Sequence, residues 1–272
     1  MAKKRPLTNP SALYRIERRL TPRARAAFLA AVKQWQADVA SGRPLNLKAL
    51  ETLVAIAEEG AKLGGEAAAA QIRAFLPGAI SFSLTNPAAV RWAKENAARM
   101  ISQIGVESRK AVKRAVVQAT QGDLTTGQVS RVIRSRVGLT VKMNDAVQAF
   151  FERALEAGYS RTDALDEMYA YTEKLIRHRS EVIARTEVLM AENRGQELLW
   201  EQGKASGALK GFKRMWMATP DELLCPICGD MNGAVTEIGE PWDLPPGITS
   251  MDGETWVMTP QTVHSQCLAA RG

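Results

Sequence analysis

The placement of the three cysteines limits most strongly how this chain can fold. Cys225 and Cys228 form one pair with two residues between them, and His264 and Cys267 form a second pair with the same spacing. Two such pairs suit a tetrahedral zinc site, because one tight turn can offer each pair and the loop between them can have almost any length. Four protein ligands would close the coordination shell. We therefore predict a structural Zn²⁺ site formed by Cys225, Cys228, His264 and Cys267.

The same residues allow two other interpretations. Cys225 and Cys228 could form a disulfide or redox pair, or all three cysteines could be buried apolar side chains. A redox CxxC normally opens a helix after a strand, whereas Asp230 to Gly233 indicate a turn here. Zinc is favoured, since every cysteine and one of the two histidines fall into matched pairs.

The segment around these ligands has little regular apolar pattern. Phe212 to Thr219 alternates large apolar residues, which predicts a strand, and a second short strand is expected at Thr255 to Met258. The rest is rich in glycine and proline, so it cannot bury much core, and a metal is the usual substitute. We expect a small zinc-binding domain over residues 211–272.

Residues 26–210 indicate a multi-helix body. The chain is 46% hydrophobic with only 6% aromatic residues, which favours a mainly α fold followed by the small, irregular, β-containing segment. Apolar periodicity and caps predict helices at about 21–41, 46–62, 86–105, 106–119, 125–137, 144–157 and 160–199. Gly64, Gly65 and Gly105 indicate breaks between helices, and a further break is expected near His178.

Charge is distributed unevenly along the chain, whose net charge is +7. Residues 215–270 contain eight acids and no Lys or Arg. The first 25 residues form a basic N-terminal arm in which the basic residues face only Glu17. We predict that this arm and a second basic stretch meet DNA phosphates or an acidic surface, through Lys3, Lys4, Arg5, Arg15, Arg18 and Arg19 and through Arg109, Lys110, Lys113 and Arg114.

Two other interpretations of the basic residues remain open. The charges at 109–114 could form a solvated face that acids from elsewhere in the fold neutralise. The two short helices at 125–137 and 144–157 resemble a helix-turn-helix in size, with Arg131, Arg134 and Arg136 on the candidate reading helix. Short paired helices are common in helical domains, so this signal is weak.

No apolar segment follows Met1 to Pro6, and no apolar run approaches the length that spans a membrane. We expect a protein of a reducing compartment with no membrane partner. The helix motif at 185–193 carries Arg and Glu, but no nucleophile or phosphate loop accompanies it, so we do not expect an enzyme.

Several motifs between Ser180 and Cys267 together resemble one known family. A helix with Arg185, Thr186, Glu187 and Asn193 is followed by a Trp-bearing strand, an acid before CxxC, a glycine after it and a terminal HxxC. This order is similar to the phage Mu F-like head morphogenesis family, the minor head proteins of tailed phages. The resemblance covers roughly the last third of the chain.

The resemblance implies a minor capsid protein of the virion that assembles in the host cytoplasm. It would bind the portal protein and other head proteins at the portal vertex and assist head morphogenesis and DNA packaging or delivery. Its contact with double-stranded DNA would be independent of sequence. The alternative is a zinc-ribbon DNA-binding or transcription regulator, although eight acids around the metal would repel phosphate. A zinc-dependent HNH-type nuclease would need more histidines than this chain has.

Overall fold

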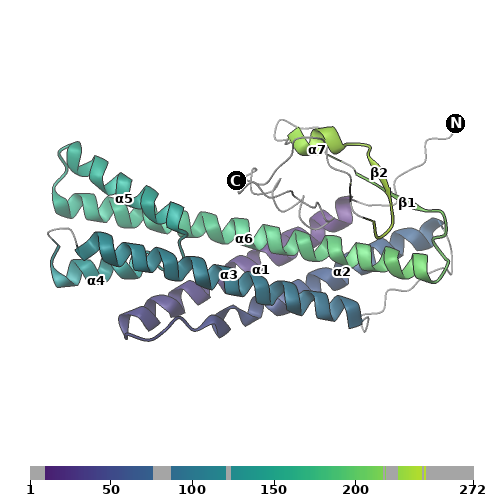
Figure 1. Cartoon of the computed structure of the whole chain (residues 1–272), viewed down its shortest axis with the longest axis horizontal. Coiled ribbons are helices and arrows are strands. Elements are labelled where there is room, and N and C mark those ends of the chain that lie inside the picture. Colours follow the sequence, from purple (N-terminus) through teal and green to yellow (C-terminus); the bar gives the residue numbers. More distant parts are fainter. Residues whose placement is uncertain are drawn as a thin grey trace. The chain divides into compact units, whose positions relative to one another are not determined.

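The computed structural model describes residues 10–75, 87–120, 124–216, 218, 226–240 and 242. These residues are mainly helical with one small two-stranded sheet, which confirms the predicted mainly α class (Figure 1). The α-helices are α1 (Pro10–Ala40), α2 (Glu51–Phe75), α3 (Pro87–Thr120), α4 (Thr126–Ser135), α5 (Val141–Glu156), α6 (Arg161–Ala205) and α7 (Pro226–Met231). A short 3₁₀ helix, η1 (Leu47–Leu50), precedes α2, and the strands are β1 (Lys213–Met215) and β2 (Val235–Glu237).

The chain divides into two compact units. Among the described residues, unit 1 contains 10–22, 55–75, 87–94 and the residues from 184 onward, whereas unit 2 contains 23–54, 95–120 and 124–183. Helices α1, α2, α3 and α6 each contribute residues to both units. The domain boundaries predicted near residues 25 and 210 stay predictions.

Helix α1 begins earlier than the sequence predicts. It starts at Pro10, so residues 10–25 of the basic N-terminal arm are helical and Pro22 lies inside the helix. A proline is usually placed in the first turn, because it lacks an N–H and its ring crowds the preceding carbonyl. Here Pro22 is exposed, and a buried apolar stripe continues past it from Ile16 and Leu20 to Ala24 and Phe28. Burial of these apolar side chains therefore outweighs the preference of Pro22 for the first turn of a helix.

In unit 1, glycines expected to end helices lie inside them. Gly64 and Gly65 are in α2, which runs to Phe75 rather than ending near residue 62. A Cβ on Gly64 would lie 2.2 Å from the carbonyl oxygen of Glu192, and one on Gly195 would lie 1.9 Å from that of Ala61. These glycines let the backbones of α2 and α6 touch, so they mark a helix crossing and not a break.

In unit 2, the predicted breaks at Gly105 and near His178 are also wrong. Helix α3 is continuous, and a Cβ on Gly105 would lie 2.7 Å from a methyl carbon of Leu47. Helix α6 continues through Arg179 and Ser180, which are both buried. Arg179 donates to the Gly138 carbonyl oxygen and to Glu107, each at 2.5 Å, so these polar residues hold the fold together instead of ending the helix.

The predicted helices after residue 124 agree better with the structure. Thr125 caps α4, and its side chain exchanges hydrogen bonds with Gln128 in a capping box. Thr140 caps α5 by accepting from the Met143 amide at 3.2 Å. Local side chain to backbone bonds define both starts. The sequence predicts the start of α4 at residue 125, but it places the start of α5 at residue 144, three residues too late.

The sheet belongs to unit 1. Strand β1 confirms the strand predicted from Phe212, but only over three residues, and it pairs antiparallel with β2 so that Arg214 faces Thr236. The sequence does not predict β2, which lies in a region read as an irregular connection. Ile238, just after β2, packs in a buried cluster with Ala68, Ile72 and Leu199. The strand predicted at Thr255 to Met258 lies outside the described residues.

Candidate functional site

The basic residues predicted to bind nucleic acid fall on two helices. Lys3, Lys4 and Arg5 lie outside the described residues. Arg15, Arg18 and Arg19 are exposed on α1 in unit 1. Arg19 pairs with Glu59 of α2 at 2.7 Å, and Arg18 lies 5.7 Å from the centre of the Tyr14 ring. One of these three arginines therefore already has a carboxylate partner.

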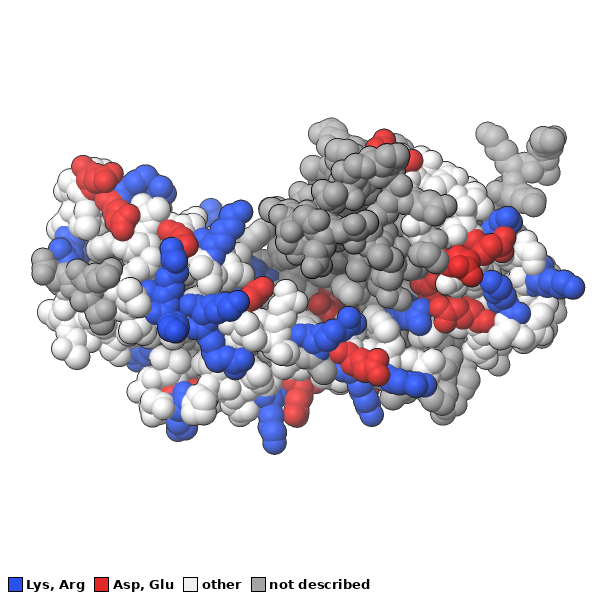
Figure 2. All heavy atoms as spheres, in the orientation of Figure 1, with Lys and Arg blue, Asp and Glu red and all other residues white. Residues whose placement is uncertain are grey.

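The second basic set lies on α3 in unit 2. Arg109, Lys110, Lys113 and Arg114 are all exposed, and Arg114 pairs with Asp145 of α5 at 2.5 Å. Within the part of the chain that the structure describes, the other three form no ion pair. Figure 2 shows Lys and Arg side chains gathered toward the end of the view where Figure 1 labels α4 and α5. The surface needed for phosphate contact is present, whereas Arg114 supports the interpretation of a partly neutralised face.

The helix-turn-helix interpretation is wrong for one of its arginines. Arg136 caps the C-terminus of α4 and is only 1% exposed, so it cannot reach a base. Arg131 is exposed, but its guanidinium stacks on the Tyr169 ring of α6, 4.0 Å from the ring centre. This part of α4 faces α6 instead of presenting a reading surface.

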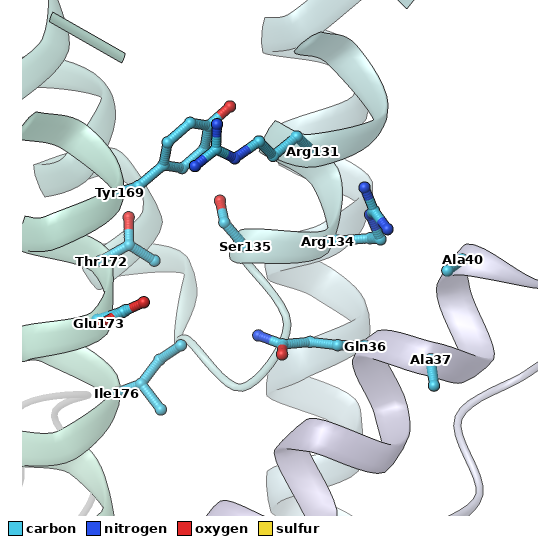
Figure 3. Close-up of a pocket in the computed structure, with 10 residues that line it drawn as sticks. All are labelled: Gln36, Ala37, Ala40, Arg131, Arg134, Ser135, Tyr169, Thr172, Glu173 and Ile176. Atoms are coloured by element: carbon cyan, nitrogen blue, oxygen red, sulfur yellow. The ribbon is translucent and has the colours of Figure 1, made fainter. Parts of the chain in front are cut away.

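Unit 2 contains an open pocket of about 500 Å³ beside these arginines, which we call the α4–α6 pocket (Figure 3). Its lining comes from α1, α4 and α6, and Glu173 and Gln36 point into it from opposite sides. The lining residues are Gln36, Ala37, Ala40, Arg131, Arg134, Ser135, Tyr169, Thr172, Glu173 and Ile176. The sequence reveals none of it, because α4 and α6 meet only in the folded chain.

In unit 1, the helix motif of the family resemblance lies on α6. Arg185, Thr186, Glu187 and Asn193 are all half-buried. Arg185 donates from Nε to Glu17 of α1 at 3.0 Å. The motif arginine therefore joins two helices of unit 1 through an ion pair that is partly shielded from water.

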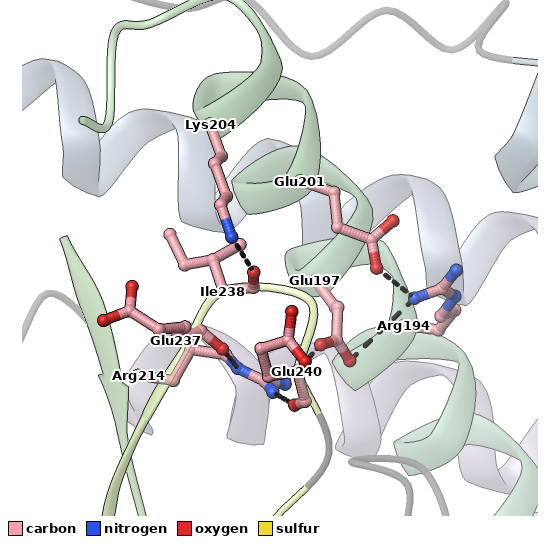
Figure 4. A network of polar contacts seen from close by, with 8 residues as sticks. All are labelled: Arg194, Glu197, Glu201, Lys204, Arg214, Glu237, Ile238 and Glu240. Atoms are coloured by element: carbon pink, nitrogen blue, oxygen red, sulfur yellow. Dashed lines mark hydrogen bonds and ion pairs between the residues drawn. The ribbon is translucent and has the colours of Figure 1, made fainter. Parts of the chain in front are cut away.

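The same helix holds the sheet through a buried ion pair that the sequence does not predict (Figure 4). Arg214 of β1 and Glu197 of α6 are each about 5% exposed at the side chain and are joined by a direct ion pair. Arg214 also donates to the carbonyl oxygens of Glu237, at 3.3 Å, and Glu240. All three guanidinium nitrogens therefore have acceptors, as a buried arginine requires.

Further contacts extend this pair, and we call the whole group the hairpin clamp: Arg194, Glu197, Glu201, Lys204, Arg214 and the carbonyls of Glu237, Ile238 and Glu240. Arg194 bridges Glu201 at 2.9 Å and Glu197 at 3.9 Å. Lys204 donates to the Ile238 carbonyl oxygen at 2.7 Å. Burial raises the pKa of Glu197, and the charges of Arg214 and Arg194 oppose that shift. The clamp fixes the sheet on α6.

Glu192, one turn after Val188 on the buried face of α6, is a second residue that sequence reasoning missed. It is 1% exposed, and neither carboxylate oxygen has a hydrogen-bond partner among the described residues. Burial, together with the nearby charge of Glu17, raises the pKa of Glu192 to about 9. The side chain is therefore protonated at neutral pH. The sequence did hold one sign of this: Glu192 follows Ala184 and Val188 at intervals of four residues, so it lies on the same buried face of the helix.

The predicted zinc ligands are only partly within the described residues. Cys225, His264 and Cys267 lie outside them. Cys228 is buried in α7, so a short helix begins where the sequence predicts a turn. The described residues contain no cluster of three His, Cys, Asp or Glu side chains suited to a metal. Because Pro226 opens a helix, the turn no longer argues against a redox pair, and the choice of zinc rests on His264 and Cys267.

Comparison with known proteins finds a match in the second half of this molecule. Residues 145–267 match the model described as Phage Mu protein F like protein. This part of the chain is similar to the phage Mu F-like family. The matched span includes α6, the hairpin clamp and all four predicted zinc ligands. No curated protein and no solved structure matches the chain.

The match confirms the resemblance drawn from the helix motif and the CxxC and HxxC pairs. The match to the phage Mu F-like model indicates a phage head-related protein, located in the virion and working with other head proteins. No helix in the described part of the chain is long and apolar enough to cross a membrane.

Proposed function

We propose that this phage Mu F-like protein is a minor head protein bound at the portal vertex, where it assists head morphogenesis and DNA packaging or delivery. The observation that carries the proposal is the family match over residues 145–267. That span contains a long helix to which a small sheet is fixed by the hairpin clamp. A small sheet fixed firmly to a long helix suits a protein that connects other proteins within an assembly.

We propose a structural role and not an enzymatic one. Charged groups of α6 and β1 support this, because Arg185, Arg194 and Arg214 each pair with a carboxylate of the same unit. Groups used in this way fix helices and strands in place. They are not poised to move a proton or to bind a reacting group.

The family motif also supports a structural zinc ion at Cys225, Cys228, His264 and Cys267. Burial of Cys228 fits a ligand that is shielded from solvent. The ion would supply a cross-link between the segment around α7 and the carboxyl end of the chain, and four protein ligands leave no position for substrate.

The zinc proposal is tested by metal content and by Cys228→Ser. We expect one zinc per chain in the unaltered protein, and loss of zinc with proteolytic sensitivity after residue 211 in the variant. Helical circular dichroism should be almost unchanged, because α1 to α6 contain none of the ligands. Absence of zinc from protein prepared without chelators would refute the site.

DNA contact is proposed at the exposed cations of α3. Arg109, Lys110 and Lys113 would meet phosphates without reading sequence, so affinity should fall steeply with salt, with a slope of about −0.9 per phosphate contact. Changing the three together to Gln should weaken binding to any duplex and reduce that slope. Arg153→Gln on α5 is the control for loss of a single exposed charge.

The portal contact is tested with purified portal protein. The full chain should bind portal assemblies in sedimentation or pull-down, and binding should persist at salt concentrations that abolish the DNA contact. If the chain binds neither the portal nor other head proteins, the assembly role is wrong. If it instead selects one DNA sequence, the alternative of a DNA-binding regulator replaces it.

A further inference from the structure

In and beside the α4–α6 pocket lie hydrogen-bond donors that have no acceptor among the described residues. The Tyr169 hydroxyl is buried and has no hydrogen-bond partner among the described residues. Arg136, next in sequence to the lining residue Ser135, is 1% exposed. Its Nη2 contacts only the Met168 sulfur at 3.2 Å, and its Nε and Nη1 have no partner in the part of the chain that is described.

Positive charge converges on Tyr169. The guanidinium of Arg131 lies 4.0 Å from the centre of its ring, and the charges of Arg136 and Arg134 also act on the phenol. Arg131 and Arg134 line the pocket, and Figure 3 shows Arg131 lying against the Tyr169 ring and Arg134 on the side of α4 toward Ala40. Positive charge from three guanidinium groups thus acts on one tyrosine whose hydroxyl is unpaired within the described residues.

The carboxylates near the pocket are too exposed to neutralise this cluster. Asp166 lies 3.8 Å from Arg131, and Glu173 of the lining lies 3.7 Å from Arg177, but all four side chains are more than half exposed. Exposed pairs at such distances are weak. Neither carboxylate pairs with Arg134 or Arg136 within the described structure.

The other two hydroxyl side chains of the lining, Ser135 and Thr172, already donate within the protein. Ser135 donates its proton to the Val132 carbonyl oxygen at 2.7 Å, and Thr172 donates to the Met168 carbonyl oxygen at 2.8 Å. The available donors are therefore the guanidinium groups, the Tyr169 hydroxyl and the side-chain amide of Gln36. A ligand with several negatively charged oxygens in a compact group satisfies such donors best, since Arg binds phosphate through paired N–H groups.

We propose that the α4–α6 pocket binds a phosphate group between Tyr169, Arg131 and Arg134, with Arg136 adding positive charge from within the protein. The pocket is open and larger than a phosphate ion, so it admits the group to which the phosphate is attached. The phosphate can belong to a free phosphate compound or to a DNA backbone. Glu173 on the opposite wall limits the affinity by repulsion.

The test measures binding of inorganic phosphate to the full chain, at constant ionic strength with chloride as the reference, by calorimetry and by thermal unfolding. Arg134→Gln should weaken phosphate binding about tenfold, the usual effect of removing one charged hydrogen-bond donor. Glu173→Gln should strengthen binding, because it removes the repelling carboxylate. Both positions are exposed, so neither change should disturb the fold.

Arg153→Gln is the matched control, since it removes an exposed arginine of unit 2 that does not line the pocket. It should bind phosphate as the unaltered chain does. No binding to the unaltered chain overturns the proposal. An equal loss in Arg134→Gln and Arg153→Gln also overturns it, because that result means general attraction to positive charge.

A second arm identifies the source of the phosphate. If a short duplex competes with inorganic phosphate and Arg134→Gln weakens both, the ligand is the DNA backbone. If duplex binding is unaffected by the variant and by phosphate, the ligand is a free phosphate compound. The triple change of Arg109, Lys110 and Lys113 should leave phosphate binding intact, so this site can fail or survive independently of the proposed DNA contact of α3.

Discussion

Two buried arginines in this protein have opposite surroundings. Arg214 in unit 1 is 5% exposed, and Glu197 with two backbone carbonyls satisfies its guanidinium. Arg136 in unit 2 is 1% exposed and contacts a sulfur atom, while Nε and Nη1 have no acceptor among the described residues. The first arginine completes a packed structure. The second leaves hydrogen-bonding capacity beside an open pocket.

Comparison with Glu192 shows why the missing partners of Arg136 bear on ligand binding as well as on packing. It is also buried without a partner, but an acid can take up a proton, and its pKa is raised to about 9 by burial and by Glu17. Burial lowers the pKa of Arg136 only to about 10, so this group stays charged at neutral pH. Unit 1 can neutralise its unpaired group by taking up a proton, whereas the unpaired group of unit 2 keeps its positive charge.

The largest expected effect is that of breaking the hairpin clamp. Arg214→Met leaves Glu197 buried without its closest cation, which typically costs about 3–5 kcal/mol. We expect a large fall in the unfolding free energy measured by denaturant titration. Lys213→Gln is the control, because it removes the neighbouring exposed pair with Glu237, 2.9 Å apart, and should have a much smaller effect. Equal effects of the two changes would show that the clamp is not a buried pair.

The next effect concerns the unpaired acid of unit 1. The folded pKa of Glu192 is raised above the ordinary value of 4.5, so its contribution to stability is complete below pH 4.5 and is lost as the pH rises through about 9. Glu192→Gln cannot ionise. It should therefore stabilise the protein by at most about 1.4 kcal/mol per pH unit across that range, or roughly 3 kcal/mol near neutrality. Parallel stability curves for the two proteins would contradict a buried, protonated acid.

Local sequence signals predicted part of this fold and missed the contacts that distinguish the units. The capping box at Thr125 and Gln128 depends on neighbouring residues, so the start of α4 was predictable. The CxxC and helix motif likewise indicated the family that the comparison confirms. The crossing at Gly64 and the partners of Arg214 and Arg136 depend on residues far apart in sequence, which no periodicity reveals.

A third prediction compares a crowded glycine of unit 1 with an open glycine of unit 2. In unit 1 a Cβ at Gly64 would meet the Glu192 carbonyl oxygen, and backbone atoms cannot move aside cheaply. Gly64→Ala should cost about 1–3 kcal/mol or more. Gly127→Ala in α4 of unit 2 is the control, because the new Cβ meets no described atom within 4 Å, and it should stabilise by about 0.5–1 kcal/mol through helix propensity. Thermal unfolding of both variants tests the crossing.

The smallest expected change in stability is the most informative one for the comparison. Arg136→Met replaces a buried and incompletely bonded cation with an apolar side chain, so the cost of its lost packing and the gain from removing a buried charge should nearly cancel. We expect a change within about 1 kcal/mol without phosphate. A loss as large as that of Arg214→Met would mean that Arg136 is paired in the folded protein, and the contrast between the two arginines would disappear. If stability is kept and stabilisation by phosphate is reduced, Arg136 serves the pocket and not the fold.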